Sequence, residues 1–230
     1  MLEKLRNLFQ PELLQPGEEA SRLAAYSPPA DQPVAPRELT RTSNGLEQFF
    51  QALDRQDRLK ILDLCGAPAT IEFLFEQQQI PRPDPFYRAL ELAFGDGPDY
   101  LDRQLEEDRV QIFTEHTLDH KEGEFDAVLL WDCLQYLRPE LLGPVLEQIR
   151  AITRPGAPLF AIFHADDRAE EIPVFSYQIQ ARNQLYLAER DRRRPAQYFS
   201  NQTIEGIFRN FGPRKFFLAR DQMREVLIWR

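Results

Sequence analysis

Glycine is scarce in this chain of 230 residues, which has 10 glycines against 18 prolines. Glycine lets a backbone come close to a phosphate or a cofactor, so its scarcity bears on any cofactor-binding fold. Cysteine is scarcer still, since only Cys65 and Cys133 are present, and this excludes a disulfide scaffold. No stretch of 18 apolar residues occurs, so the sequence predicts no membrane-spanning helix.

Basic residues are outnumbered by acidic ones, and the formal net charge is −9. We therefore expect no nucleic-acid partner, because contacts with phosphates require Lys and Arg. The balance reverses from Arg182 onward, where basic residues dominate. That part either steers an anionic partner or forms a solvated rim. The N-terminal residues carry neither a long apolar core nor a small-residue cleavage site, so we expect a cytoplasmic protein.

The first 40 residues differ from the rest of the chain. Leu2, Leu5, Leu8 and Phe9 recur at helical spacing, and residues 27–36 contain four prolines. This pattern predicts a flexible N-terminal helix followed by a Pro-rich linker over residues 1–40. The helix either binds a partner protein or packs on its own domain. With two cations it provides no stable membrane anchor.

Residues 41–230 alternate between apolar runs typical of strands and apolar stripes typical of helices. This alternation predicts an α/β fold with a doubly wound sheet. Residues 86–92 are compatible with a strand or with a helix start. We expect helices at 46–53, 69–76, 99–107, 139–152 and 201–208, and strands at 60–64, 110–113, 125–131, 158–163, 215–219 and 224–229.

A different pattern occupies residues 166–198, where alternating apolar residues predict a hairpin insertion. Tyr177, Tyr186 and Tyr198 lie in it together with the basic run 192–194. These side chains either close over an anionic or aromatic substrate or belong to a tethering hairpin with a solvated charge run.

Three stretches of the sequence together carry a resemblance to a known family. They are 61–70 (ILDLCGAPAT), 125–137 (FDAVLLWDCLQYL), and 146–163, which contains the turn Arg154-Pro155-Gly156. With the final pair of expected strands, they resemble the class I S-adenosylmethionine-dependent methyltransferases over most of residues 58–230. The resemblance implies a Rossmann-like, doubly wound, mostly parallel seven-stranded sheet with a closing antiparallel strand pair. It also implies S-adenosylmethionine as cofactor and a small molecule or a protein as substrate.

Cofactor-binding candidates begin at the end of the first strand. Strand carboxyl ends in an open α/β sheet form the ligand crevice, and Asp63 ends the first strand. Cys65, Gly66 and Ala67 follow in the turn, where Gly66 and Ala67 are small enough for a ligand to approach the backbone. A carboxylate that ends the second strand can accept hydrogen bonds from a ribose diol. Glu91 is the candidate for that role and Asp96 the alternative.

The later strands supply further candidates. The resemblance places Glu115 or His116 against the adenine. Trp131 follows the fourth strand, where an aromatic face beside a sulfonium would make a cation–π contact.

Methyl transfer requires a general base only when the acceptor is protonated, since the sulfonium methyl is already activated. Asp132, His164 and Asp166 lie near the carboxyl ends of the fourth and fifth expected strands. Asp132 and His164 are the catalytic candidates, although Asp132 could instead cap a turn and His164 could be a satisfied strand-end histidine. The spacing of His116 and His120 matches no metal-binding motif.

The first stretch departs from the family in its glycines. The family's three alternating glycines correspond to Cys65, Ala67 and Ala69 here, and each Cβ restricts close approach of a ligand. The sequence therefore leaves two hypotheses open. One is an active methyltransferase, and the other is a catalytically inactive methyltransferase-like protein that binds or interacts.

Overall fold

The computed structural model describes residues 37–54, 59–64, 87–89, 118–166, 169–218 and 221–230. All of them belong to one compact unit, Pro36–Arg230. The expected N-terminal helix, the expected helices at 69–76 and 99–107, and the expected strand at 110–113 lie outside the described residues.

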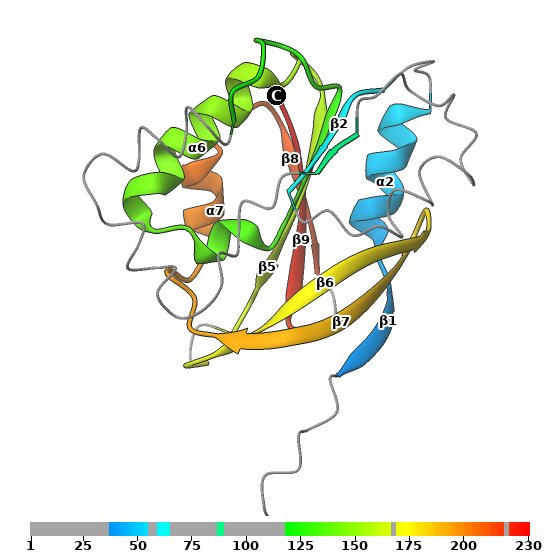
Figure 1. The fold of residues 1–230 in the computed structure, drawn as a ribbon, viewed down its shortest axis with the longest axis vertical. Coiled ribbons are helices and arrows are strands. Elements are labelled where there is room, and N and C mark those ends of the chain that lie inside the picture. The colour runs from blue at the N-terminus through cyan, green and yellow to red at the C-terminus, as the bar shows by residue number, and fades with distance from the viewer. Residues whose placement is uncertain (1–36, 55–58, 65–86, 90–117, 167–168, 219–220) are drawn as a thin grey trace, which may run out of the picture. The chain divides into compact units, whose positions relative to one another are not determined.

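A six-stranded sheet, called the main sheet below, forms the centre of the unit (Figure 1). Its first four strands in spatial order are parallel, and β9 runs antiparallel to its neighbours β5 and β8. The predicted closing antiparallel pair is therefore confirmed, and six of the seven expected strands lie among the described residues. The spatial order is β3 (Tyr87–Ala89), β2 (Ile61–Asp63), β4 (Ala127–Trp131), β5 (Pro158–His164), β9 (Met223–Trp229) and β8 (Arg214–Leu218).

The chain order of these strands gives the sheet a switch point. From β2 the chain continues to β3 on one side and then reaches β4 on the other side of β2. Ligands of open α/β sheets bind outside the carboxyl ends of the strands at such a reversal. The fold is thus α/β and Rossmann-like. The carboxyl ends of β2 and β4 are the expected place for a ligand.

Two helices cover one face of the main sheet, α6 (Pro139–Ile152) and α7 (Asn201–Ile207). The buried stripe of α6 packs against β4, β5 and β9 in one apolar cluster. Ser200 caps α7, and its side chain accepts a hydrogen bond from the backbone N of Thr203 at 3.1 Å. Both helices agree with the sequence prediction, because periodicity and capping residues are local signals.

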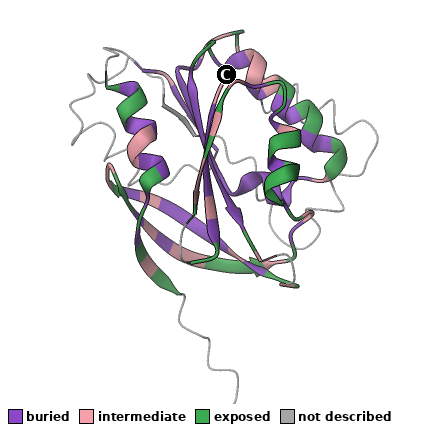
Figure 2. Ribbon diagram, turned by 180° about the vertical axis from the view of Figure 1, so that it is seen from behind, coloured by how far each residue is buried: buried purple, intermediate pink, exposed green. Residues whose placement is uncertain are grey.

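The opposite face carries α2 (Asn44–Leu53) and a small antiparallel sheet, in which β7 (Gln184–Arg193) lies between β1 (Glu38–Thr42) and β6 (Ile172–Ala181). Strands β6 and β7 form the expected hairpin, and it runs across the lower part of the main sheet in Figure 1. Apolar side chains of both sheets and of α2 join in a second cluster. Figure 2 shows buried residues along the main sheet and exposed ones on the outer sides of the helices.

No local pattern predicts β1, because Glu38–Thr42 has a single large apolar side chain, Leu39. The strand forms by pairing with β7. A buried polar group anchors it, since the Arg41 guanidinium contacts Glu225 on β9 at 2.7 Å. The other Glu225 carboxylate oxygen accepts a hydrogen bond from the backbone N of Gly45 at 2.8 Å. Residues 38–40, expected in the linker, are thus part of the fold.

Candidate functional site

The carboxyl ends of three adjacent strands carry the described site candidates. Asp63 ends β2, Trp131 ends β4 with Asp132 directly after it, and His164 ends β5. In the parallel part of the sheet these ends lie at one edge, where the small sheet crosses (Figure 1). The fold therefore brings together four residues that are spread over about 100 positions of the sequence.

Asp63 and Trp131 contact each other directly. The indole Nε1 of Trp131 donates a hydrogen bond to Oδ1 of Asp63 at 2.7 Å, and both residues are buried. Trp131 has a φ of 49°, in the left-handed region, which is unfavourable for a bulky side chain. The register between β4 and β5 also shifts between Leu129 and Trp131. This strained strand end fixes the indole against the Asp63 carboxylate.

An aromatic stack covers the Trp131 ring. Tyr177 of β6 lies parallel to it, with ring centroids 4.9 Å apart and an interplanar angle of 11°. Phe160 of β5 meets the same indole edge-on at 5.9 Å. We expected Trp131 to face a sulfonium, but the structure places its ring inside the second apolar cluster with an exposed fraction of 1%.

Asp132 and His164 form a second pair. Their Oδ2 and Nε2 atoms are 3.6 Å apart, which is an ion-pair distance slightly too long for a hydrogen bond. Both side chains are buried, and neither of these two atoms has a hydrogen-bond partner. Gln135, on the short helix η3 (Cys133–Tyr136), holds the strand end, because its Oε1 accepts a hydrogen bond from the backbone N of His164. Buried polar atoms without partners are uncommon and mark candidate functional groups.

The chemistry of this pair suits proton transfer. A carboxylate facing Nε2 favours a proton on that nitrogen, so a neutral His164 ring keeps its lone pair on Nδ1. Phe175 lies nearly parallel to the imidazole, with ring centroids 6.2 Å apart. His164 is thus an oriented group that can accept a proton, with Asp132 behind it.

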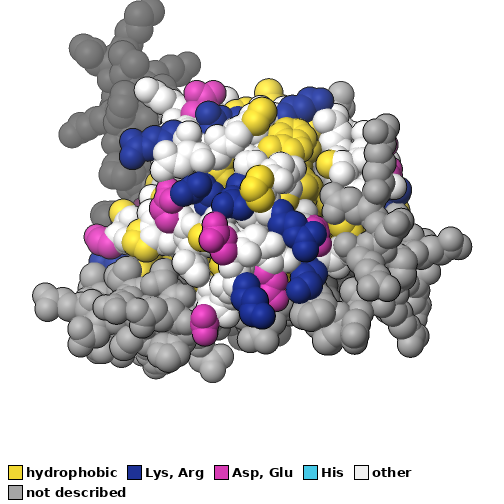
Figure 3. Space-filling model, turned by 90° about the horizontal axis from the view of Figure 1, so that it is seen from above, with side chains coloured by type: hydrophobic (Ala, Val, Ile, Leu, Met, Phe, Trp, Pro, Cys, Tyr) yellow, Lys and Arg dark blue, Asp and Glu magenta, His cyan; other side chains and the backbone are white. Residues whose placement is uncertain are grey.

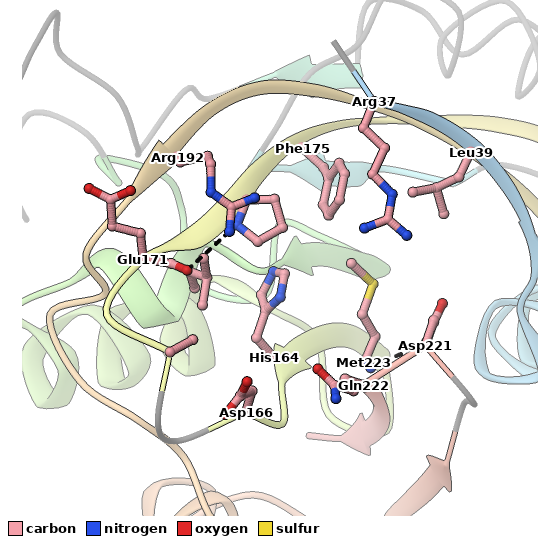
Figure 4. A pocket seen from close by; sticks show the side chains of 13 residues that line it. Arg37, Leu39, His164, Asp166, Glu171, Phe175, Arg192, Asp221, Gln222 and Met223 are labelled. Atoms are coloured by element: carbon pink, nitrogen blue, oxygen red, sulfur yellow. Dashed lines mark hydrogen bonds between the residues drawn. The ribbon is translucent and has the colours of Figure 1, made fainter. Parts of the chain in front are cut away.

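A pocket of about 200 Å³ opens beside His164 (Figure 4). Arg37 and Leu39 enter it from the start of β1, and Arg192 from the end of β7. Phe175 on β6 and Met223 on β9 line it as well. Trp131 and Asp132 are absent from its lining, so the pocket lies at the β5 end and not at the β2/β4 switch point.

The remaining site candidates fall outside the described residues. They are Cys65, Gly66, Ala67, Glu91 with its alternative Asp96, and Glu115 with its alternative His116. Cys133 is buried in the first apolar cluster.

Sequence reasoning missed two parts of this site. Arg37 lies in the expected linker, and no local pattern signals that it reaches the pocket. Gln135 follows a strand end by four residues, and only the fold shows that it contacts the backbone of His164. Arg192, by contrast, belongs to the basic run that we considered for substrate contacts.

The described residues at the opposite edge of the main sheet carry charges of both signs. Figure 3 shows this face, where Lys and Arg side chains are interspersed with Asp and Glu. Arg154 pairs with Asp126 there, and Lys60 lies 3.7 Å from Glu124. These basic groups are thus matched by carboxylates close by.

Two searches over the described part of the chain were negative. No three His, Cys, Asp or Glu side chains in that part are grouped so that they could hold a metal ion. Within the same residues, no helix combines the length and the apolar character needed to cross a membrane.

Comparisons with known proteins return solved structures of low sequence identity. No protein-family model and no curated protein sequence matches the chain. A 1,6-didemethyltoxoflavin-N1-methyltransferase of Burkholderia thailandensis, solved with 1,6-didemethyltoxoflavin and S-adenosylhomocysteine, is similar at 15% identity and a TM-score of 0.44. The match covers 96% of this chain and 92% of that one.

Two further solved structures are similar over 80% of this chain. The PH0226 protein of Pyrococcus horikoshii has 13% identity, a TM-score of 0.45 and 87% of its own length covered. A SAM-dependent methyltransferase of Aquifex aeolicus has 14% identity, a TM-score of 0.42 and 90% of its length covered. All of these TM-scores lie below 0.5, so the functional assignment rests on the sheet order and the residues of this chain.

Proposed function

We propose that this protein is an S-adenosylmethionine-dependent methyltransferase of class I that acts on a small molecule or a protein. The main sheet carries the proposal. Its order β3-β2-β4-β5-β9-β8, with β9 alone reversed, has the closing antiparallel pair that the sequence resemblance implies. It also creates a switch point at the carboxyl ends of β2 and β4, next to the Asp132–His164 pair.

The residues at this edge fit the cofactor in their chemistry. Asp63 supplies a carboxylate at the switch point, and Asp132 and His164 have buried polar atoms without hydrogen-bond partners. In the proposal Asp63 and Trp131, at the ends of β2 and β4, line the side of the cofactor site that faces the main sheet. Cys65, Gly66 and Ala67 form its loop, Glu91 or Asp96 binds the ribose, and Glu115 or His116 contacts the adenine. When bound, S-adenosylmethionine supplies a methyl group that its sulfonium has already activated.

His164 is the proposed general base. It accepts the proton of the acceptor's hydroxyl or amine while the acceptor's lone pair forms the new bond to the methyl carbon. The electron pair of the breaking carbon–sulfur bond stays on sulfur. Asp132 is a positioning residue, because it faces Nε2 at 3.6 Å and stabilises the imidazolium that forms. The pocket beside His164 holds the acceptor and excludes part of the surrounding water.

A second candidate function has its own support. Tyr177 occupies the face of Trp131 on which a ligand would stack, and the loop carries Cys65, Ala67 and Ala69 where the family has glycine. These features favour a methyltransferase-like protein that binds or interacts without catalysis. In that case the residues before β1, 1–36, would act as a tether, and deleting them would abolish capture of the partner.

Calorimetry with S-adenosylmethionine tests the first proposal. We expect saturable heat with the wild-type chain and weaker binding with Asp63→Asn, which keeps an acceptor oxygen for Trp131 but removes the charge. Asp126→Asn is the matched control, because Asp126 is also a buried aspartate but lies before β4, at the opposite edge. No heat at high ligand concentration would contradict the proposal.

Transfer of a labelled methyl group to components of a cell extract separates the two functions. An active enzyme labels an acceptor, and His164→Gln reduces labelling while binding of S-adenosylmethionine persists. Binding of the cofactor without any labelling supports the second candidate.

A further inference from the structure

Two arginines line the pocket beside the His164 ring. Figure 4 shows the Arg37 and Arg192 guanidinium groups directed toward the pocket that the imidazole enters from below. Arg37 directly precedes β1 and Arg192 lies near the end of β7. Pairing of these strands brings them together, and the backbone N of Glu189 donates a hydrogen bond to the Arg37 carbonyl oxygen at 2.9 Å.

Among the described residues, the polar contacts of the two guanidinium groups are those of Arg192. Arg192 contacts Oε1 of Glu189 at 3.1 Å and the carbonyl oxygen of Glu171 at 3.4 Å, near the limit of a hydrogen bond. No ion pair to the Arg37 side chain occurs within the part of the chain that the structure describes. The planar set of donors of the Arg37 guanidinium suits a carboxylate or a phosphate.

Three carboxylates also line the pocket, those of Asp166, Glu171 and Asp221. Asp221 is engaged elsewhere, with Oδ2 3.3 Å from Arg41 and Oδ1 accepting a hydrogen bond from the backbone N of Met223. The Glu171 carboxylate points away from His164 in Figure 4, and Asp166 lies on the other side of the imidazole from the two guanidinium groups. The space between Arg37 and Arg192 is thus open to an anion.

Apolar side chains form the other walls of the pocket. Leu39, Phe175 and Met223 line it, and the Phe175 ring lies parallel to the imidazole. A ligand that fits has an apolar body and an anionic end. Guanidinium groups bind carboxylates and phosphates with paired, charge-assisted hydrogen bonds.

We propose that the methyl acceptor is a small organic acid whose anionic group binds Arg37 and Arg192. Its apolar body packs against Phe175 and Met223, and a neighbouring hydroxyl or amine faces His164. This inference rests on the proposed methyltransferase function, because it assigns the acceptor of that same site. In this proposal Arg37 and Arg192 select the acceptor by its charge, and the small sheet positions them.

Binding of simple acids tests the inference in the absence of cofactor. Benzoate, phenyl phosphate and the neutral benzamide are titrated into the full chain while backbone amide signals of Phe175 and Met223 are followed by NMR. We expect saturable shifts with an acid and none with benzamide. Arg37→Gln and Arg192→Gln each weaken binding about tenfold or more. Arg190→Gln, an exposed arginine on the same strand that does not line the pocket, binds as the wild type does.

The outcomes separate this inference from the proposed function. Equal binding of benzoate and benzamide, no binding of any acid, or unchanged affinity in both pocket variants overturns the anionic acceptor. Binding of an acid by a chain that does not bind S-adenosylmethionine retains the anion pocket but contradicts the methyltransferase. Tighter binding of benzoate or of phenyl phosphate identifies the anionic group that the pocket prefers.

Discussion

The two strand-end regions of the main sheet are built in opposite ways. At the β2/β4 end, Asp63, Trp131 and Tyr177 are all buried, and their polar and aromatic groups face one another. At the β5 end, His164 borders a pocket, and its Nε2 faces Oδ2 of Asp132, which follows β4, with no hydrogen bond to either atom. Groups that pack on one another in the core stabilise the fold, whereas polar groups that border a pocket are available for chemistry.

This difference predicts a separation of effects. Changes at the β2/β4 end should act first on the free energy of unfolding, because they remove packing and buried hydrogen bonds. Changes at the β5 end should act first on the rate of methyl transfer.

Trp131→Ala should have the largest effect on stability. It removes a fully buried ring that stacks on Tyr177 and contacts Phe160, and such truncations cost about 3–5 kcal/mol. Urea denaturation measures the change. Trp229→Ala is the matched control, since the only other tryptophan is partly buried at the end of β9. Equal losses in both variants would contradict the special role of the β2/β4 end.

His164→Gln should have the largest effect on rate. Loss of a general base lowers the rate of methyl transfer by about 10²–10⁴-fold, with little change in the urea midpoint. His120→Gln serves as the control, because His120 precedes β4 at the opposite edge of the sheet. If the His164 variant transferred methyl groups at an unchanged rate across the pH range, His164 would not be the general base.

Trp131→Phe should have a smaller effect that isolates the hydrogen bond. The variant keeps an aromatic ring over Tyr177 but withdraws the Nε1 donor from the buried Asp63 carboxylate, at a cost of about 1–3 kcal/mol. Adding Asp63→Asn should recover part of that loss, because the uncharged amide is less costly to bury. Additive losses in the double variant would show that the two groups do not interact.

The smallest expected effect concerns Glu225, which anchors the β1 strand next to the pocket. Burial raises the pKa of the Glu225 carboxyl above its ordinary value, more than the charge of Arg41 lowers it. A carboxyl with a raised pKa in the folded state loses stabilisation as the pH rises through that pKa.

Glutamine at this position does not titrate, so the stability of Glu225→Gln relative to the wild type should increase between about pH 4 and about pH 7. Urea denaturation at both values measures the difference. A stability difference that is independent of pH would contradict the raised pKa.

Local signals in the sequence predicted most of the described fold. The α6 helix was predicted with its observed bounds, because Pro139 begins it and apolar residues recur at helical spacing up to Ile152. Short apolar runs also located β4, β5 and the terminal strand pair. Strand β1 could not be predicted, since it depends on pairing with β7 and on a contact between Arg41 and Glu225, 184 positions apart.

The candidate site was predictable only in part. Strand ends located Asp63, Asp132 and His164, because parallel strands end at one edge of a sheet. The stacking of Tyr177 on Trp131 could not be predicted, because it depends on where the hairpin packs. Arg37 reaches the pocket only through the long-range pairing of β1.

A crystal structure with S-adenosylhomocysteine bound tests the central claim most directly. The account predicts the ligand at the carboxyl ends of β2 and β4, with its sulfur toward the His164 pocket and a carboxylate on its ribose hydroxyls. A crystal soaked at high concentration that shows no ligand at this edge, with Tyr177 still stacked on Trp131, would contradict it.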